Sequence, residues 1–598
     1  MISLHSMRRK LWTYLLAVIL FCLVLSYCNI PVTSRAHQAE GVSAALGDDD
    51  TQSVWRRLQP YHPVSSMRPL PTGKPLSLPK VQRRFGKESA TACKVRLERQ
   101  AVVKDTFTRC WNSYRARAWM SDELTPVSGS RRDPFGGWGA TLVDSLDTLW
   151  IMGMRHEFDE AAAAAVNITF DETTPLGEIN VFETNIRYLG GFLSAYDLSG
   201  DKRLLRKARE VGDMLYVAFD TPNRMPITRW DLHAAARGED QVAHENVLVA
   251  EMGTFTLEFF RLSLLTGDGK WFDAAQRIMD VFYEQQNTTQ LPGMWPIVVN
   301  AKKQQFNQHN DFTLGAMADS LFEYLPKTHA LLGGLLPMYR EMYEAAMHTA
   351  AKYNLFRPML PDEKNVLVSG MVGTSRTESG TVTELRPDGQ HLVCFAGGMF
   401  ALGGKLTQND DHVGLGEKLV DGCVWTYQAM PLAIMPETFN MLPCPNRDHC
   451  AWDERKWKEE VLKKAGEQAS DLDKADVVIA QKRLPKGFTS IGDTRYILRP
   501  EAIESVFVLY RITGRTDLLE SAWAMFQAIE SNTRTELANS ALNDVTVAKD
   551  PSMSDSMESF WMGETLKYFY LIFSEPDLVS LDEYVFNTEA HPLKRLLP

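Results

Sequence analysis

RPEAIESVFVLYRITG, residues 499–514, places two glutamates directly after an Arg-Pro step and ahead of an apolar run. Pro500 suits the first position of a helix, because it has no N–H group to leave unsatisfied there. Acids in the first turn are favoured by the unpaired N–H groups and by the positive end of the helix dipole. Considered alone, Glu501 and Glu504 therefore indicate an ordinary helix start. The rest of the chain has to show whether they also have a chemical role.

The same arrangement of an acid, a small residue and a long apolar stretch recurs along the chain. The other copies are FETNIRYLGGFLSAY (182–196), AEMGTFTLEFFRL (250–262), ADSLFEYL (318–325), PETF (436–439) and GETLKYFYLIF (563–573). The leading acids are Glu183, Glu251, Asp319, Glu437, Glu501 and Glu564. Neighbouring acids lie 63 to 68 residues apart, except for an interval of 118 residues that is close to two repeats. This repeat predicts a series of similar helical units.

A period of this length fits a helical hairpin, that is, two helices and their connections. Hairpins that cannot bury their apolar faces alone stack on their neighbours, as an open solenoid or as a closed ring. In a closed ring the repeated acids would reach one mouth, where their mutual repulsion requires a cation or a hydroxyl-rich ligand. Crowding also raises a carboxyl pKa, and glycosidases need one protonated and one ionised carboxyl group. The pattern therefore favours a sugar-hydrolysing ring over a helical interaction scaffold, which leaves the acids unexplained.

The first 91 residues differ in composition from the remainder. Residues 11–28 form a run of 18 residues without a charge behind a basic tail, which predicts an uncleaved transmembrane anchor with residues 1–10 cytosolic. A cleaved signal peptide is the alternative, but the run lacks a clear cleavage site. Residues 29–91 are polar and rich in Pro and Ser, which predicts a stem or linker. Residues 92–598 are predicted to form a lumenal helical domain, with a strand near 364–372 and an exposed helical insertion at 453–485.

Composition and smaller motifs exclude several other classes of protein. The chain of 598 residues carries a net charge of −11, which argues against non-specific nucleic-acid binding. The sequons at Asn167 and Asn287 predict N-glycosylation and fit a lumenal chain. None of the eight cysteines belongs to a C-x-x-C pair, which argues against a zinc ribbon or a redox motif. HENVL (244–248) begins like a zinc-protease motif, but Leu248 replaces the second histidine.

Seven separated motifs, taken together and in order, carry a resemblance to a known family. They are DSLDTLWIMG (144–153), VFETNIRYLGG (181–191), ADSLFEYL (318–325), HLVCFAGG (391–398), RPEAIESVF (499–507), ESFWMGETLKYFY (558–570) and VFNTEAHPL (585–593). From about residue 92 to 596 the chain resembles glycoside hydrolase family 47, the class I α-1,2-mannosidases of the secretory pathway. The anchor and stem resemble the type II membrane form of that family.

The resemblance implies a fold, a metal and a reaction. The fold is an all-α (α/α)7 barrel of helical hairpins with a short β-hairpin or loop plug. The metal is a calcium ion at the base of the barrel. The reaction is the inverting removal of terminal α-1,2-linked mannose from high-mannose N-glycans, from Man9GlcNAc2 toward Man8 and Man5. The catalytic domain would be monomeric, lumenal and held at the membrane of the endoplasmic reticulum or Golgi by its single-pass anchor.

Carried over motif by motif, the resemblance also implies residue roles. Glu183 would be the general acid, acting through a water, Glu501 the general base and Asp319 a third essential carboxylate, although the distribution of roles among these three stays open. Thr588 would bind calcium through its carbonyl and hydroxyl oxygens. Glu251, Glu437, Glu504, Glu564 and Glu589 would order the surrounding waters. Arg187, His391, Arg499 and Phe560 would hold the mannose.

General chemistry agrees with these roles, although each residue has a plainer interpretation. Calcium accepts six to eight oxygen ligands in irregular geometry, and an inverting enzyme needs room for a water between its carboxyl groups. Without the resemblance, however, Thr588 would indicate a turn or a helix cap. Arg187 and Arg499 would indicate structural ion pairs, and His391 and Phe560 would indicate core residues.

The resemblance pairs Cys394 with Cys423. Cys444 and Cys450 would then close a short loop, and Cys93 and Cys110 are the remaining pair. One departure from the family concerns Met317, which stands two positions before Asp319, where enzymes that remove a single mannose carry an arginine. Loss of that long cation predicts a wider cleft and broader trimming, as in Golgi-type and secreted fungal-type enzymes.

A second function belongs to a different class. Glycan-binding degradation factors of the same fold mark misfolded glycoproteins, and they carry similar motifs, but they often have long C-terminal extensions. This chain stops at Pro598, directly after the VFNTEAHPL motif, and it retains every expected carboxylate. We therefore expect a hydrolase. The absence of a KDEL-type ending assigns any retention to the anchor region.

Overall fold

The computed structural model describes residues 54–171, 173–378 and 380–598, which belong to one compact unit, Gly47–Pro598. The predicted anchor at 11–28 and the first part of the predicted stem lie outside the described residues. Within the described ranges, no helix combines the length and the hydropathy that a bilayer crossing requires.

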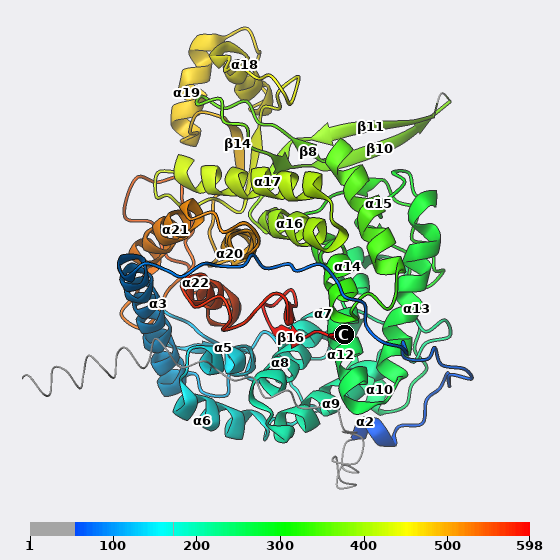
Figure 1. Ribbon diagram of the computed structural model, residues 1–598. Helices are drawn as coiled ribbons and strands as arrows, with labels where there is room; N and C mark the ends of the chain where they lie inside the picture. The colour runs from blue at the N-terminus through cyan, green and yellow to red at the C-terminus, as the bar shows by residue number, and fades with distance from the viewer. Residues whose placement is uncertain (1–53, 172, 379) are drawn as a thin grey trace, which may run out of the picture. The chain divides into compact units, whose positions relative to one another are not determined.

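Helices dominate the described chain, and most of them pack in pairs around a ring (Figure 1). The pairs are α5 (Leu146–Ile151) with α6 (Arg155–Ala165), α8 (Gly190–Ser199) with α9 (Lys202–Val217), α12 (Thr256–Thr266) with α13 (Lys270–Gln285), α14 (Asp319–Leu331) with α15 (Met338–Tyr353), α16 (Phe395–Thr407) with α17 (Asp410–Ala429), α20 (Glu501–Thr513) with α21 (Asp517–Thr533), and α22 (Leu566–Ile572) with α3 (Ala90–Arg117). The first member of each pair also contacts the first members of the neighbouring pairs. The circuit closes where η6 (Trp561–Thr565), the π-helical turn before α22, contacts α5.

The remaining elements are short. The helical ones are α2 (Val54–Arg57), α4 (Ala140–Asp144), α7 (Val181–Glu183), η3 (Thr184–Leu189), α10 (Leu232–Ala236), α11 (Val249–Gly253), η4 (Gln286–Thr288) and η5 (Leu392–Cys394). The paired strands are β1 (Glu123–Leu124) with β2 (Arg131–Arg132), β3 (Ile179–Asn180) with β4 (Arg229–Trp230), β5 (Val247–Leu248) with β6 (Val298–Val299), and β8 (Leu355–Phe356) with β9 (Val368–Ser369).

Two larger sheets join the helical repeat, and each has three strands. One sheet consists of β12 (Asp388–Gln390), β13 (Thr438–Met441) and β14 (Phe488–Asp493), in that order. The other contains β7 (Asp311–Phe312) and the exposed hairpin of β10 (Met371–Thr377) and β11 (Gly380–Arg386). The strand expected near 364–372 is confirmed, since this range covers β9 and the start of β10. The insertion expected at 453–485 is also confirmed, because it holds α18 (Glu454–Lys464) and α19 (Leu472–Lys482), which pack on each other.

Helix α16 illustrates how the ring is packed. Its sequence is apolar on all sides and almost all of its residues are buried, as expected for a helix enclosed by neighbours. A Cβ atom on Gly397 would lie 2.7 Å from Val420 in α17, and one on Gly398 would lie 3.1 Å from Ser505 in α20. The glycines therefore allow α16 to approach both neighbours more closely than alanine would.

A β-hairpin occupies the interior of the ring. It consists of β15 (Tyr584–Phe586) and β16 (Pro592–Lys594), and Figure 1 shows β16 inside the circle of helices. β15 contacts α14, and β16 contacts α8 and α12. The turn between the two strands, residues 587–591, is thereby held among the inner helices.

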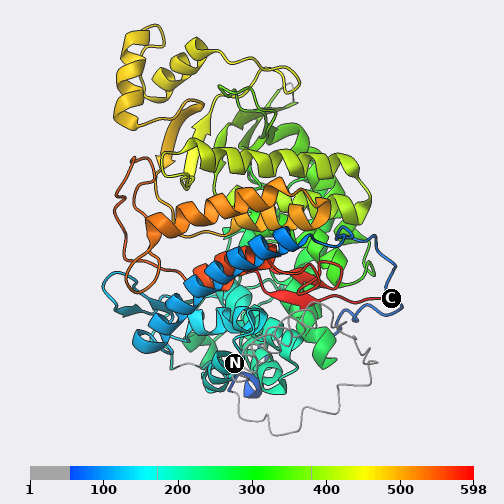
Figure 2. The same cartoon turned by 60° about the vertical axis from the view of Figure 1, so that its left-hand side comes forward.

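The described part of the predicted stem lies on the ring. Between α2 and α3, residues 58–89, here called the strap, run without regular secondary structure across one open end of the ring (Figure 1). The turned view in Figure 2 shows the blue α3, which follows the strap, beside the red α22. The strap donates a backbone hydrogen bond from Leu76 to Gly333 at the end of α14, and another from Arg83 to Arg511 near the end of α20, both at 2.8 Å.

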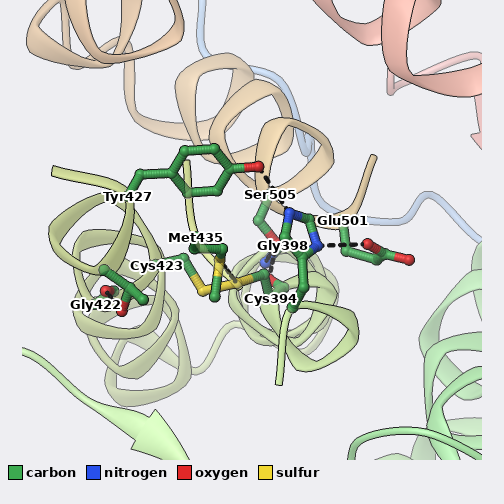
Figure 3. The surroundings of a disulfide bond; sticks show 10 residues. Cys394, Gly398, Gly422, Cys423, Tyr427, Met435, Glu501 and Ser505 are labelled. Carbon is green, nitrogen blue, oxygen red and sulfur yellow. Dashed lines mark hydrogen bonds and ion pairs between the residues drawn. A yellow bond between two sulfur atoms is a disulfide. The ribbon is translucent and has the colours of Figure 1, made fainter. Parts of the chain in front are cut away.

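Two disulfides cross-link the domain. Cys394–Cys423 joins the start of α16 to α17, which confirms the predicted pair (Figure 3), and Cys444–Cys450 closes a short loop. The proposed pairing of Cys93 with Cys110 is wrong. Both residues lie on α3, and 17 residues of helix separate them by about 25 Å, far beyond the reach of a disulfide.

The two disulfides should differ in their contribution to stability. Because Cys394–Cys423 spans 29 residues and Cys444–Cys450 only 6, loop entropy predicts that replacing the first pair with alanines lowers the free energy of unfolding by about 3.5 kcal/mol, against about 2 kcal/mol for the second. Denaturant unfolding of the two double variants measures this. An equal loss in both variants would contradict the prediction.

Candidate active site

Five of the six repeated acids lie at or near the start of a helix, as the sequence predicts. Asp319 is the first residue of α14, and Glu501 is the first residue of α20. Glu183 ends the short helix α7, Glu251 lies in α11 and Glu564 lies in η6. The ring therefore gathers these carboxylates from five different places in the chain.

Glu437 is the exception, and the helix expected at PETF is wrong. Glu437 directly precedes β13, which pairs with β12 and β14, so this stretch is a strand. The corresponding place in the ring is taken by α16, and His391 lies shortly before that helix. The backbone N–H of His391 donates to the backbone oxygen of Glu437 at 2.9 Å. The sheet thus brings Glu437 beside His391 from outside the helical repeat.

Glu501 lies in an environment that favours the ionised form. Its Oε2 is 2.8 Å from Nδ1 of His391, whose Nε2 is 2.7 Å from the Tyr427 hydroxyl (Figure 3). Arg499 lies 3.6 Å from the other oxygen of Glu501 and also pairs with Glu437. Burial alone would raise the pKa of Glu501, but the hydrogen bond from His391 and the charge of Arg499 lower it below the ordinary value. Glu501 is therefore suited to accept a proton.

Asp319 shows the opposite shift. Burial raises the pKa of its carboxyl to about 7, the negative charges of Glu323 and Glu501 act in the same direction, and the backbone N–H of Ser320 and the charge of Arg499 act against them. Two carboxyl groups of one site thus have pKa values on opposite sides of the ordinary range. Such a separation is how enzymes provide an acid and a base at the same pH.

Arg187 joins the acid Glu183 to the turn of the central hairpin. Its Nε donates to Glu183 at 2.9 Å, and its Nη1 donates both to Glu589 and to the hydroxyl of Ser559. Ser559 in turn donates to Asp144. The guanidinium is buried, so these pairs form away from water, and the interpretation of Arg187 as a structural ion pair is compatible with a role in the site.

A second buried network continues from Asp144 to the same turn. His591 places Nε2 at 3.3 Å from Asp144 and Nδ1 at 2.8 Å from Asp147. Lys567 pairs with Asp147 at 2.8 Å and donates to the backbone oxygen of Ala590 at 2.7 Å. All four side chains are inaccessible to solvent, so the turn is fixed from below by charged hydrogen bonds.

Buried carboxylates also crowd the interior below Glu501. Burial raises the pKa of Glu504 to about 8, although the charge of Lys327 acts against the shift. Burial and the charges of their neighbours raise the pKa of Glu564 and Glu589 well above the ordinary value. Lys327 donates to Glu323 and lies 3.3 Å from Glu504, so its single charge serves two carboxylates. The interior therefore holds more carboxyl groups than its own cations can keep ionised.

A hard divalent cation would allow these carboxyl groups to ionise. Among the described residues, no group of three or more His, Cys, Asp or Glu side chains converges as a metal site. Thr588, however, lies on the hairpin turn next to Glu589, with its backbone N–H 3.3 Å from the Tyr324 hydroxyl. Thr588 and Glu589 carry hydroxyl, carbonyl and carboxylate oxygens, and calcium or a similar ion prefers oxygen ligands, including waters held by nearby carboxylates. The residues around Thr588 therefore fit such an ion.

Three further predicted residues lie close to this interior. Glu251 pairs with Arg229 at 2.6 Å, an arginine that the sequence did not single out. Phe560 is buried, and its ring centroid is 5.9 Å from the guanidinium carbon of Arg187. Met317 is 54% exposed and has a φ of 74°, so its side chain is open to solvent beside α14. The structure thus gives Met317 no buried packing role.

Several charged residues of the site had no role in the sequence interpretation. They are Asp144, Asp147, Glu258, Glu323, Lys327, Glu558, Lys567 and His591. Glu258, for example, is fully buried and accepts hydrogen bonds from Tyr324 and Asn587 at 2.7 and 2.8 Å. Glu258, Lys327 and Lys567 each interrupt an apolar helical run, and a charge in that position is the sequence signal that would have identified them.

The comparison with known families agrees with this geometry. The family model described as glycosyl hydrolase family 47 matches residues 106–595. The structure is similar to the α-1,2-mannosidase from Trichoderma reesei, with a TM-score of 0.70 and 30% sequence identity, covering 83% of this chain and 99% of that one.

Curated relatives are similar over most of the chain. The endoplasmic reticulum mannosyl-oligosaccharide 1,2-alpha-mannosidase of Homo sapiens is 35% identical over 500 residues, which cover 83% of this chain and 64% of the human protein. Mannosyl-oligosaccharide 1,2-alpha-mannosidase MNS1 of Arabidopsis thaliana is 35% identical over 505 residues, which cover 83% of this chain and 79% of the plant protein. Residues 106–595, which the family model matches, include every residue of the site described above.

The buried Glu504 predicts a pH dependence of stability in the metal-free protein. Its folded-state pKa of about 8 lies above the value of about 4.5 expected in the unfolded chain. The folded form therefore binds more protons between these values, and stability should fall as pH rises from about 4.5 to about 8. In chelator, Glu504→Gln should show a smaller loss of melting temperature over this interval than the parent protein.

The exposed Glu536 provides the matched control, because Glu536→Gln should leave the pH dependence unchanged. Identical pH profiles for Glu504→Gln and the parent would show that Glu504 is not the titrating group.

Proposed function

This chain belongs to glycosyl hydrolase family 47, and we propose that it is a mannosyl-oligosaccharide 1,2-α-mannosidase that trims high-mannose N-glycans. The observation that carries the proposal is the arrangement of Glu183, Asp319 and Glu501 on three separate helices of one ring, with His391 and Arg499 beside Glu501. An inverting glycosidase needs more than one carboxyl group, since one donates a proton to the leaving oxygen while another activates water. The packing of seven helical pairs in the described chain supports the (α/α)7 form of barrel.

The contacts support a division of roles among the carboxyl groups. Glu501 is the general base, because His391 and Arg499 keep it ionised and oriented. Glu183 is the general acid, and its side chain is 25% exposed, which gives a water access to its carboxyl group. Asp319 is the third essential carboxylate, and its raised pKa of about 7 suits a group that holds a proton near neutral pH. Arg187, Arg499, His391 and Phe560 line the position of the mannose.

For the metal, the proposal is calcium held by the carbonyl and hydroxyl oxygens of Thr588. When bound, the ion would position the attacking water and bind sugar hydroxyls. The chain's own contribution is the array of carboxylates that orient the surrounding waters. These are Glu251, Glu437, Glu504, Glu564 and Glu589. The raised pKa values of Glu504, Glu564 and Glu589 support the assignment, because a divalent cation would stabilise their ionised forms.

The remaining expectations concern the product and the location of the protein. The exposed Met317 supports broad trimming, from Man9GlcNAc2 toward Man8 and Man5. The exposed side chains of Asn167 and Asn287 support their use as glycosylation sites. We place the catalytic domain, as a monomer, in the lumen of the endoplasmic reticulum or Golgi, held by the anchor at 11–28. A glycan-binding degradation factor remains the second candidate, favoured only by the shared fold.

The first test is the release of mannose from Man9GlcNAc2. Glu501→Gln should lower kcat by roughly 10² to 10⁴, since the side chain can no longer accept a proton, and calcium chelation should abolish release by the parent protein. Glu520→Gln on the outer helix α21 is the matched control. Unchanged release by Glu501→Gln would falsify the mechanism, and no release by the parent protein would favour the glycan-binding alternative.

The interaction of His391 with Glu501 predicts a change in the pH profile. His391→Ala removes the hydrogen bond that lowers the pKa of Glu501, so this pKa should rise. Because the base must be ionised, the acid limb of kcat/KM should move to higher pH. Tyr427→Phe removes only the group on the far side of the imidazole, and it should cause a smaller displacement. An acid limb that stays in place in His391→Ala would assign it to another group.

Met317 predicts the extent of trimming. A timed digest of Man9GlcNAc2 should pass through Man8 to smaller glycans, and Met317→Arg should slow the steps beyond Man8 by about tenfold, because the added cation narrows the cleft. Chromatography of the released glycans measures both. Accumulation of a single Man8 isomer by the parent protein would contradict the proposed breadth.

A further inference from the structure

We propose that the strap is a positioning element of the catalytic ring, in which Gln82 fixes the hairpin that carries Thr588. This inference rests on the proposed function only where it concerns the metal. The strap precedes residues 106–595, the range that matches the family, so it is a feature of this chain outside the matched region.

Gln82 contacts the segment that leads into the hairpin. Its Oε1 accepts a hydrogen bond from the backbone N–H of Leu581, and its Nε2 donates to the backbone oxygen of Pro576, both at 3.2 Å. The preceding residue, Val81, is fully buried and donates its backbone N–H to Asp582 at 2.8 Å. Residues 576–582 are therefore bound by the strap immediately before β15 begins.

Gln82 also satisfies a buried cation. Arg511 donates from Nη1 to Oε1 of Gln82 at 3.2 Å and from Nη2 to the backbone oxygen of Leu571 at 2.9 Å. Arg511 is fully buried, and burial lowers the pKa of its guanidinium to about 10. Within the described chain, its hydrogen-bond partners are backbone carbonyl oxygens and this one side-chain amide. Loss of Gln82 would therefore leave a buried charge with fewer partners, which is strongly unfavourable.

The strap reaches the other side of the hairpin as well. A Cβ atom on Gly333 would lie 2.5 Å from Pro75 of the strap and 2.8 Å from the backbone oxygen of Leu596, just after β16. Leu596 donates its backbone N–H to Leu331 at 2.9 Å. The strap, the end of α14 and the segment that leaves the hairpin therefore pack together without free space. Both segments that flank the hairpin are held at this end of the ring.

This end of the ring is remote from the catalytic carboxylates. Arg83 of the strap donates to the backbone oxygen of Thr513 at the end of α20, and Glu501 is at the start of the same helix. A helix of 13 residues separates these two positions by about 20 Å. The strap therefore cannot contact the substrate, and it acts through the hairpin turn of Thr588 and Glu589.

The experiment compares three single variants of the full chain. Gln82→Ala removes all three contacts of the amide. Gln82→Glu keeps an acceptor for Leu581 and Arg511. Arg84→Ala changes an exposed neighbour in the strap. The first readout is hydrogen exchange of residues 576–596 in the metal-free protein, and the second is the calcium concentration that gives half of the maximal increase in melting temperature.

Gln82→Ala should accelerate exchange in residues 576–596 and weaken calcium binding measurably, but by less than the roughly tenfold that loss of a direct partner of a metal ligand causes. Gln82→Glu and Arg84→Ala should both remain near the parent protein. Exchange and calcium affinity of Gln82→Ala equal to those of the parent protein would overturn the proposal. Equal losses in Gln82→Ala and Arg84→Ala would also overturn it, because the effect would then not depend on the contacts of Gln82.

A protease-cleavable form of the full chain provides a second test if Gln82→Ala does not fold. A protease recognition sequence inserted at the exposed residues 86–88 allows the folded, calcium-loaded protein to be cut at the end of the strap, just before α3. Faster exchange at 576–596 after cutting supports the proposal, and unchanged exchange overturns it. Hydrogen exchange requires no catalysis, so a failure of the proposed glycosidase activity would leave this result intact and distinguishable.

Discussion

The structure depends on the balance of negative charge inside a closed ring of helices. Three buried or half-buried cations, Arg187, Arg499 and Lys327, each contact two or more carboxylates. Burying so many acids is unfavourable, because each must exchange its hydration for imperfect pairing. The same crowding sets the chemistry, since burial raises the pKa of Asp319 while the hydrogen bond from His391 and the charge of Arg499 lower the pKa of Glu501. The reactivity of the site and the energetic cost of burying its acids thus have a common origin.

The hairpin inside the ring holds the charged residues of the site in defined positions. Glu258 on α12 accepts hydrogen bonds from Asn587 and Asn185, so one buried acid joins the hairpin to a second inner helix. On the opposite side, Lys567 and His591 bind Asp147, which lies in α5. The turn is therefore fixed by several separate helices, and a disturbance in any of them would reach Thr588. This arrangement gives a structural role to charged residues in buried positions that apolar side chains could also fill.

The sequence predicted the part of the structure that local patterns encode. The acids at the starts of α14 and α20 were predicted because helix-start chemistry and helical repeats are visible along the chain. The strand at Glu437 was missed, because its pairing with β12 and β14 joins segments about fifty residues apart. The contact between Lys327 and the site was missed because Glu504, its second carboxylate partner after Glu323, lies 177 residues away. The pairing of Cys93 with Cys110 failed for a different reason: the two cysteines are on one helix, which holds them apart.

The strap also has a consequence for how the chain is assembled. The bond between Val81 and Asp582 joins residues 501 positions apart, so the earliest part of the described chain waits for a partner that is synthesised hundreds of residues later. Until residue 582 has been synthesised, Val81 and the apolar residues around it remain unpacked. The intervening helices can already pair with each other during this time. The strap can therefore cover its end of the ring only late in folding. A nascent chain should remain accessible to chaperones until the hairpin of β15 and β16 packs inside the ring.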